Sequence, residues 1–411
     1  MTVDTGERLG GRFAKLWAAS TASALGSGLA TVATPLLVAS RTDSPLIVSA
    51  AFAVGWLPWL LFALPGGVLV DRVDRRRLMI LIDWVRVAAM AVLATAILTG
   101  HAGLVLLYVV LFVVNTGEIV LRAASQAMVP AVVPRSRLER ANGWLMGGAM
   151  LTNGMIAGPL GGFLFAVAAS LPFFANAVTY AASAVLVTLI AGAYRAAPEP
   201  GAAERPRSVR AEIVEGFRWL AHQRVLRTMA GLIGLLNVTL TAALAVLVLL
   251  AKDRLHLGSV GYGALFTCMA VGGILGSVAG DRIIRAVSAT WTVRVGLLIE
   301  TGLHLILATS RNAYVVGVAL FAFGVHGALW GIVGSTLRQR LTPPEMLGRV
   351  GSTILFVVAG GNCVGALLGG AIAATFGLTA PYWVGFVVAA LVTAGTWRVF
   401  NRAAMAEAYE R

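Results

Sequence analysis

The sequence is poor in charged side chains and nearly lacks cysteine and lysine. Only 12% of its 411 residues are charged, which is about half the fraction found in a typical soluble domain. Such a small charged surface excludes a water-soluble globular protein, and the apolar content of 58% excludes intrinsic disorder. The two cysteines, Cys268 and Cys363, lie in separate apolar runs and form neither a disulfide framework nor a metal-ligand pattern.

Several motifs of enzymes and ATP-driven proteins are missing. The two lysines, Lys15 and Lys252, lie outside any Gly-x-x-x-x-Gly-Lys context, so no P-loop is present. The sequence also contains no His-Glu-x-x-His and no Gly-x-Ser-x-Gly, which are the signatures of zinc proteases and serine hydrolases. We therefore expect a protein that is not an enzyme and that uses neither a metal nor a cofactor.

What the chain does contain is apolar sequence in long runs. A membrane-spanning helix needs about 20 apolar residues, and only helices and closed barrels satisfy the backbone in lipid. We expect an all-α integral membrane protein with twelve spans in two six-helix bundles, residues 1–194 and 228–411, joined by a polar linker at 195–227 with an amphipathic stretch at 212–227. The expected spans are 13–39, 45–70, 78–99, 103–127, 142–169, 171–194, 228–251, 259–284, 291–309, 313–337, 350–376 and 380–400.

The net charge of +14 is explained by topology rather than by nucleic-acid binding. With the N-terminus in the cytoplasm, 26 of the 32 Arg and Lys residues fall on cytoplasmic segments and four on external loops. This is the positive-inside pattern of membrane proteins. The sequence thus predicts a multi-pass protein of the inner (plasma) membrane, with both termini cytoplasmic and basic loops facing an anionic leaflet.

The two halves repeat one another. Asp71-Arg72 recurs as Asp281-Arg282 at an offset of 210 residues, and Gly161-Gly162 recurs as Gly369-Gly370 at an offset of 208. Pro134, Leu138 and Arg140 also recur 209 residues later. Parallel repeats of a six-helix unit are typical of transporters.

Two motifs indicate a conformational switch. The stretch Gly67–Arg77 places Asp71 and Arg72 before a basic cluster that includes Arg75 and Arg76, and such charges can hold one packing of a bundle and release another. A simple positive-inside stop with incidental acidic residues would give a similar sequence.

The second motif lies in the fifth span, where Gly154, Gly158 and Pro159 allow close helix contact and remove one backbone hydrogen bond. A packing motif without a switching role is the alternative. Both motifs are assigned as switch candidates.

These motifs resemble those of the major facilitator superfamily, Gly-x-Leu-x-Asp-Arg-x-Gly-Arg-Arg and Gly-x-x-x-Gly-Pro-x-x-Gly-Gly. Asp74 stands where the first pattern has glycine, a departure that resembles the branch of macrolide-efflux and enterobactin-exporter proteins. Phe163 stands where the second pattern has its last glycine. The resemblance implies a proton-coupled exporter of a small molecule, and we expect the protein to be a monomer. The resemblance also implies that spans 1, 4, 7 and 10 line a central cavity.

Polar stripes at helical spacing fall on the spans that the resemblance assigns to the cavity. The candidates for substrate contact are Ser27, Thr31, Tyr108, Asn115, Gln126, Asn237, His326 and Trp330. A histidine titrates near neutral pH, and a tryptophan face can hold an apolar or cationic ligand. A lone histidine in a membrane helix can equally be a hydrogen-bonded packing residue.

Charged residues inside spans are costly and commonly functional. Glu118 and Arg122 are spaced to pair on one helix and are assigned to proton coupling, with a permanent structural salt bridge as the alternative. Asp83 is also a coupling candidate, although snorkelling of Asp83 and Arg86 toward the membrane surface, or a network of charges near the cytoplasmic face, is favoured. Glu300, four residues before His304, is a candidate for a secondary protonation site or for helix packing.

Together these features predict a secondary active transporter that exports a small amphipathic molecule, a drug-like compound or a siderophore, by proton antiport and alternating access. A lipid flippase or an uptake symporter of the same fold is the alternative. A membrane sensor that does not transport is a further one, disfavoured because a sensor does not need two switching halves. An intramembrane enzyme is disfavoured by the missing motifs.

Overall fold

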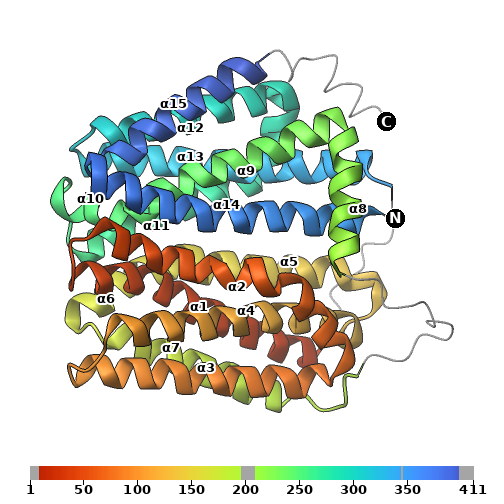
Figure 1. Ribbon diagram of the computed structural model, residues 1–411. Coiled ribbons are helices and arrows are strands. Elements are labelled where there is room, and N and C mark those ends of the chain that lie inside the picture. The colour runs from red at the N-terminus through yellow and green to blue at the C-terminus, as the bar shows by residue number, and fades with distance from the viewer. Residues whose placement is uncertain (1–8, 196–208, 344–345, 398–411) are drawn as a thin grey trace. The chain divides into compact units, whose positions relative to one another are not determined.

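The computed structural model describes residues 9–195, 209–343 and 346–397, and this part of the chain contains helices and no strands. Eleven of the described helical segments are long and apolar enough to cross a membrane, and α15 (Ala380–Thr396) is a shorter apolar helix. They correspond in order to the twelve expected spans, so the predicted all-α membrane fold is confirmed. Figure 1 shows these helices coloured along the chain.

The first six spans are built from eight helical segments. These are α1 (Gly11–Ala39), α2 (Pro45–Arg72), α3 (Arg75–Leu98), α4 (Leu104–Val132), α5 (Leu138–Ala149), the π-helix η2 (Met150–Ile156), α6 (Ala157–Val167) and α7 (Leu171–Thr188). The fifth span is therefore one rod of α5, η2 and α6. The one-turn helix η1 (Arg135–Arg137) precedes it.

The remaining helices follow the linker. They are α8 (Val209–His222), α9 (Arg224–Ala245), α10 (Leu247–Asp253), α11 (Ser259–Val287), α12 (Ala289–Thr309), α13 (Ala313–Leu341), α14 (Leu347–Phe376) and α15. Helices α9 and α10 together form one candidate span. The amphipathic stretch expected at 212–227 is helical, but α8 ends at His222 and α9 begins at Arg224.

The contacts divide the chain into two compact units. Unit 1 comprises Met1–Ala33 and Leu61–Ala203, and unit 2 comprises Thr34–Leu60 and Glu204–Arg411. The end of α1 and the first half of α2 therefore pack with the later helices. Ser49 lies against Gly370 of α14, and Cys363 Sγ donates to the carbonyl oxygen of Ala53 at 3.5 Å.

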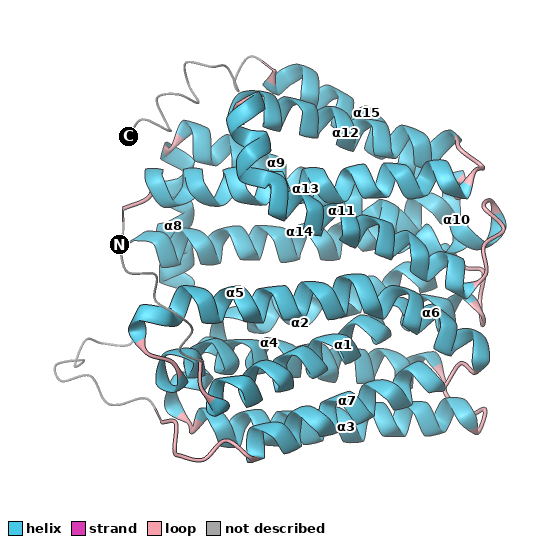
Figure 2. Ribbon diagram, turned by 180° about the vertical axis from the view of Figure 1, so that it is seen from behind, coloured by secondary structure: helices cyan, strands magenta, loops and turns pink. Residues whose placement is uncertain are grey.

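In unit 1, α3 lies between α4 and α7, and Figures 1 and 2 both show α3 and α7 running side by side. The buried face of α3 repeats at helical spacing through Met79, Asp83, Arg86, Met90 and Leu93. Two of these five side chains are charged. This places charge in the middle of an apolar core, where it needs partners.

In unit 2, α11 and α13 pack closely because glycines face each other across the contact. A side chain at Gly276 would meet the carbonyl oxygen of Val325 at 2.7 Å, and Gly272 and Gly324 are equally crowded by backbone atoms of the opposite helix. Small residues that let backbones approach are the usual means of packing helices in membranes.

Helix α8 crosses α14 near the N-terminal end of α14 rather than running alongside it (Figure 1). Arg349 Nη1 donates to Glu215 Oε1 at 2.8 Å, and Gly216 lets α8 approach the backbone of Arg349. The polar linker helix is thereby attached to the beginning of α14.

Candidate functional site: a buried guanidinium shared by two carboxylates

The centre of the site is Arg86 of α3, whose side chain is 1% exposed. Its Nη2 donates to Glu118 Oε2 at 2.5 Å, and its Nη1 lies 3.3 Å from Asp83 Oδ1. One guanidinium thus serves two carboxylates, one from its own helix and one from α4. The fork geometry of arginine allows this, because its five N–H groups point in fixed directions.

Hydroxyl groups of α1 also accept hydrogen bonds from Arg86. Ser23 Oγ accepts from Nη1 at 2.9 Å, and Ser27 Oγ accepts from Nη2 at 3.1 Å. Ser27 also donates to Glu118 Oε2 at 3.0 Å. The spacing of four residues puts both hydroxyls on one face of α1, so α1 contacts both members of the ion pair.

Helix α7 supplies the remaining walls. The guanidinium carbon of Arg86 lies 3.7 Å from the centroid of the Tyr180 ring, a cation–π arrangement. Ser183 Oγ donates to Asp83 Oδ2 at 2.7 Å, and the hydroxyl of Tyr180 lies 3.1 Å from Ser27 Oγ. Four helices therefore meet at this cluster.

Sequence reasoning missed the contribution of α7. Asn176, Tyr180 and Ser183 are all fully buried and recur at the four- and three-residue spacing of one helix face in an otherwise apolar span. That spacing was a readable signal. It was overlooked because no charged residue in the span drew attention to it.

The second cation of the cluster is placed differently from the first. Arg122 Nη2 lies 3.8 Å from Glu118 Oε1, and the Arg122 side chain is 55% exposed. The spacing predicts a Glu118–Arg122 pair, and that contact is present. The nearer partner of Glu118, however, is Arg86. Arg86 is on another helix, so spacing along the chain could not predict this contact.

Snorkelling of Asp83 and Arg86 is wrong, whereas the two residues do take part in a network of charges with Glu118. Their side chains are 0% and 1% exposed, because their helix turns them toward α1, α4 and α7 rather than toward the membrane surface. The ion pair lies in a folded interior, where it is hydrogen-bonded by Ser23, Ser27, Ser183 and Glu118.

Gly117 explains how Arg86 can lie against α4. A side chain at Gly117 would meet Cδ of Arg86 at 2.9 Å. Glycine at this position leaves the space that the arginine stem occupies. Glu118, the next residue, remains 17% exposed, so it is the more accessible of the two carboxylates.

The other residues of α1 and α4 that were predicted to contact substrate do not gather around Arg86. Thr31 is exposed and donates to the carbonyl oxygen of Ser27, and Asn115 donates to Leu111 of its own helix. Tyr108 is half-buried and Gln126 is exposed. Only Ser27 of this group is brought to Arg86.

Unit 2 contains a second buried titratable cluster. Glu300 Oε2 of α12 lies 3.5 Å from His326 Nε2 of α13, and both side chains are about 5% exposed. Glu300 and His304 lie four residues apart on α12, and both side chains are buried. His326 of the neighbouring helix fits beside them because Gly296 has no side chain.

The other residues of unit 2 are placed as follows. The His326 ring packs edge-on against Phe323 and Trp330. Trp330 also lines a cavity of about 230 Å³ together with Ser335 and Arg338. Asn237 donates to the carbonyl oxygen of Ile233 in its own helix.

The loop before α3 is described from Val73 onward. Gly67, Asp71 and Arg72 fall in the part of α2 whose side chains the structure does not describe. Arg76 Nη2 donates to the carbonyl oxygen of Thr188 at 2.6 Å, and Arg75 Nη1 donates to that of Ala127 at 3.0 Å. Arg76 therefore binds the end of α7, where the backbone carbonyls and the helix dipole favour cations.

Asp74 caps α3 and joins it to the segment after α7. Its Oδ1 accepts from Arg77 N at 2.9 Å, and its Oδ2 accepts from Tyr194 N at 2.8 Å. Burial raises the pKa of this carboxyl, but the two backbone hydrogen bonds and the charges of Arg77 and Arg76 outweigh burial, so the net pKa is lowered. The residue that departs from the family pattern thus has a structural role of its own.

The fifth span is interrupted by a π-helical turn. Gly154 lies within η2, and Gly158 and Pro159 begin α6 directly after it. Pro159 has no N–H to donate to the preceding turn, and Ala157 N donates to Thr152 O in the wider π pattern. Gly28 of α1 lies against this region, where an added side chain would meet Cβ of Ala157 at 2.5 Å.

Among the described residues, no group of three or more His, Cys, Asp or Glu side chains is arranged to hold a metal ion. Both cysteines are free.

Known proteins similar to this chain are efflux proteins. The family described as transmembrane secretion effector matches residues 10–409. A multidrug efflux pump, Tap of Mycolicibacterium fortuitum, is 27% identical over 89% of this chain and 90% of its own length. The enterobactin exporter EntS of Escherichia coli O1:K1 / APEC is 27% identical over 87% of this chain and 84% of its own length.

A third relative matches over a shorter stretch. Macrolide efflux protein A of Streptococcus pyogenes is 30% identical over 32% of this chain, and the chain spans about a third of that protein, 33% of its length.

Solved structures show the same fold. A mutant form of the nucleoside transporter NupG matches with a TM-score of 0.76 and 9% identity over 95% of this chain and all of that one. A bacterial homologue of the iron transporter ferroportin in its inward-facing state matches with a TM-score of 0.72 and 16% identity over 96% of this chain and all of that one. At these identities the likeness concerns the fold alone.

The relatives and the structural neighbours are transporters rather than enzymes. With the buried charge cluster and the all-helical fold, the family match leads to one conclusion. The chain is a multi-pass membrane transporter of the major facilitator superfamily and belongs to its transmembrane secretion effector family.

Proposed function

We propose that this transporter exports a small amphipathic molecule, either a drug-like compound or a siderophore, in exchange for protons. The support for export is that similar proteins over most of the chain are an efflux pump and a siderophore exporter. Proton exchange is supported by buried carboxylates in a bundle that lies in the membrane.

The observation behind the coupling proposal is that one buried guanidinium is shared by two carboxylates. Asp83 and Glu118 carry two negative charges, and Arg86 balances only one of them. The other nearby positive charge, Arg122, is mostly exposed and lies farther from Glu118. A proton on one carboxylate would leave the buried trio electrically neutral. Glu118 is the proposed acceptor because it is the more accessible carboxylate.

Protonation of Glu118 would change how the helices are held together. The ionised carboxylate accepts hydrogen bonds from Arg86 of α3 and Ser27 of α1. A neutral carboxyl binds a guanidinium far more weakly, because charge-assisted hydrogen bonds are about twice as strong as neutral ones. The proton thereby loosens α4 from α1 and α3, which is the kind of local change that alternating access requires.

Further roles follow in the same scheme. Asp83 and Glu300 are proposed as additional protonation sites, the latter through its contact with His326. The proposed substrate contacts are Ser27, Thr31, Tyr108, Asn115, Gln126, Asn237, His326 and Trp330. The proposed switch elements are Gly67, Asp71, Arg72, Arg75, Arg76, Gly154, Gly158 and Pro159.

We also propose two bundles at 1–194 and 228–411, each working as one switching half. The protein would be a monomer of the inner (plasma) membrane with both termini in the cytoplasm. The support is the excess of arginine on the segments assigned to that side. The membrane potential would then drive proton entry, at about 2.3 kcal/mol per charge per 100 mV.

Transport in reconstituted vesicles tests the function. Inside-out vesicles containing the wild-type protein should accumulate a fluorescent macrolide or enterobactin when the lumen is acidified, and collapse of the pH gradient should stop accumulation. Glu118→Gln should lose gradient-driven transport, whereas Glu139→Gln, an exposed glutamate at the start of α5, should retain it.

The alternatives predict different outcomes of the same assay. Loss of substrate from preloaded vesicles, in the same outward direction as the protons, would indicate a symporter. Movement of labelled phospholipid without any pH dependence would indicate a flippase. Binding without accumulation would indicate a sensor. Unchanged gradient-driven transport in Glu118→Gln would reject Glu118 as the coupling residue.

A further inference from the structure

We propose that a pocket at the beginning of α3 binds the phosphate of an anionic phospholipid. The pocket has a volume of about 490 Å³ and is lined by Val73, Asp74, Arg77, Leu78, Leu81, Ala193 and Arg195. It lies between the first turns of α3 and the segment that follows α7. Because the candidate span begins at Arg75, the pocket is at the boundary between the membrane and water.

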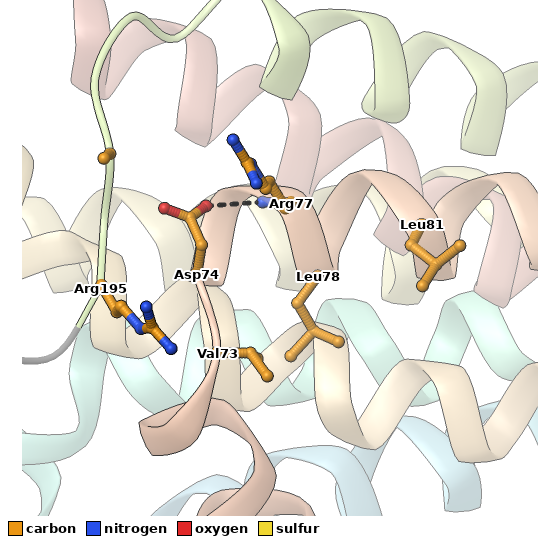
Figure 3. Close-up of a pocket in the computed structure, with 7 residues that line it drawn as sticks. Val73, Asp74, Arg77, Leu78, Leu81 and Arg195 are labelled. Carbon is orange, nitrogen blue, oxygen red and sulfur yellow. Dashed lines mark hydrogen bonds between the residues drawn. The ribbon is translucent and has the colours of Figure 1, made fainter.

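The charges of the pocket favour an anion. Figure 3 shows Arg77 and Arg195 on opposite sides of Asp74, and both arginines are exposed. In the described part of the chain, neither guanidinium donates a hydrogen bond to a protein oxygen. Both therefore have donors available for a ligand, and a phosphate matches the planar fork of arginine.

Asp74 does not cancel this preference. Both of its carboxylate oxygens already accept backbone N–H groups, from Arg77 and from Tyr194. With one acid and two arginines, the pocket carries a formal charge of +1. This charge suits a phosphodiester whose head group has no compensating cation better than a zwitterionic lipid.

The apolar half of the pocket continues along the helix into the membrane. Leu81 is 63% exposed, Trp84 is 48% exposed and Val92 is 54% exposed. With Arg77 they lie on one face of α3, at spacings of four, seven and fifteen residues. The opposite face is the buried one that contains Asp83 and Arg86.

This arrangement distinguishes a lipid from a free phosphate. A cationic end followed by a lipid-facing apolar stripe matches a molecule with an anionic head and a hydrocarbon chain. Trp84 lies roughly 10 Å from Arg77 along the helix axis, given a rise of about 1.5 Å per residue. A soluble phosphate would use the two arginines and would gain nothing from Leu81.

Lipid retention in native mass spectrometry tests the proposal. The full-length protein would be purified in detergent, equilibrated with equal amounts of phosphatidylglycerol and phosphatidylcholine, and measured for the lipid that it retains. We expect the wild type to retain phosphatidylglycerol preferentially. Each of Arg77→Gln and Arg195→Gln should reduce that retention about fivefold, in line with the contribution of one basic residue at an anionic surface.

Three controls separate the outcomes. Arg140→Gln removes an exposed arginine of α5 in the same unit and should leave retention unchanged. Leu81→Gln should reduce lipid retention although it removes no charge. Millimolar inorganic phosphate should not displace the lipid. Unfolding temperatures equal to that of the wild type would show that the variants are folded.

Two results would overturn the proposal. The pocket is not the lipid site if the Arg77→Gln/Arg195→Gln double variant retains as much phosphatidylglycerol as Arg140→Gln does. Displacement of the lipid by inorganic phosphate, with no effect of Leu81→Gln, would show an anion site that does not select lipids. Neither result depends on transport activity, so the proposed export function is tested separately.

Discussion

Arg86 Nη2 and Glu118 Oε2 are 2.5 Å apart, although their residues lie on different helices and 32 positions apart in the chain. This contact joins α3 to α4 inside an apolar interior. The same guanidinium also lies beside Asp83 and over the Tyr180 ring. One side chain of α3 therefore contacts both α4 and α7.

Replacement of Arg86 is expected to destabilise the protein strongly. Arg86→Gln leaves Asp83 and Glu118 buried without their shared counter-ion, and an uncompensated buried charge costs about 3–5 kcal/mol. Thermal unfolding in detergent would measure the loss. The combination with Glu118→Gln should recover part of it, because one of the two carboxylates that lost Arg86 is then neutral; a double variant less stable than Arg86→Gln would contradict this account.

Substitutions at Tyr180 separate its two contacts. Tyr180→Phe keeps the ring under Arg86 but loses the hydroxyl near Ser27, so we expect a loss of about 1 kcal/mol. Tyr180→Leu also removes the cation–π contact and should lose a further 0.5–2 kcal/mol, roughly, beyond the effect of volume. Equal stability of the two variants in unfolding experiments would rule out a contribution from the ring face.

Asp74→Ala is expected to lower stability in a pH-dependent way. The substitution removes the cap of α3 and the bond to Tyr194, at a cost of about 1–2 kcal/mol at pH 7. Because the pKa of Asp74 is lowered in the folded state, its charge stabilises the protein above the unfolded pKa of about 3.9. That contribution disappears as the pH falls through the lower, folded pKa.

Unfolding of wild type and Asp74→Ala at pH 7 and at successively lower pH would measure this effect. The gap between the two proteins should narrow only as the pH drops below about 4. A gap that is constant down to pH 2 would show that the ionisation of Asp74 does not matter. Asp74→Asn, which still caps a helix well, should fall between the two.

Gly324→Ala is expected to disrupt the contact between α11 and α13. The added methyl group would clash with the carbonyl oxygen of Met269, a backbone atom that cannot rotate away, so we expect a loss of about 1–3 kcal/mol. Gly331→Ala on the same helix has nothing within 4 Å and should be neutral or stabilising by up to about 1 kcal/mol. Thermal unfolding of both variants gives the comparison, and equal effects would refute the packing argument.

Glu300 and His326 should be energetically coupled. Removal of either partner leaves the other buried without its contact, so Glu300→Gln and His326→Gln should each destabilise the protein, and their effects should not add. We expect a coupling of about 0.5–3 kcal/mol in a double-mutant cycle. Strict additivity would show that the 3.5 Å contact has no energetic role.

The sequence was most informative about the elements that depend on composition. A helix that crosses a membrane must be apolar over its whole length, so the run from Ala313 to Leu341 could be located without any knowledge of its neighbours. Motif spacing was similarly sufficient to indicate the family. The limits of α8 and the division of the fifth span by η2 were not visible, because they depend on local hydrogen bonding.

The site was predicted only where its contacts are local. Glu118 and Arg122 lie four residues apart, and helical geometry alone brings them together. The partners of Arg86 are on α1, α4 and α7, and those of Glu300 include a histidine on the next helix. Periodicity shows which face of a helix a residue occupies but not which neighbouring helix covers that face.

By itself, therefore, the sequence determined that this chain is an all-helical membrane protein, with motifs that recur 208 to 210 residues apart and with few charges inside its apolar runs. Each of those properties is a property of one helix or one spacing along the chain. Only the tertiary structure decided that Arg86 is buried and shared between Asp83 and Glu118. The reason is physical: a charge in an apolar interior is stabilised by whatever the packing of other helices brings to it, and packing joins residues that the chain keeps far apart.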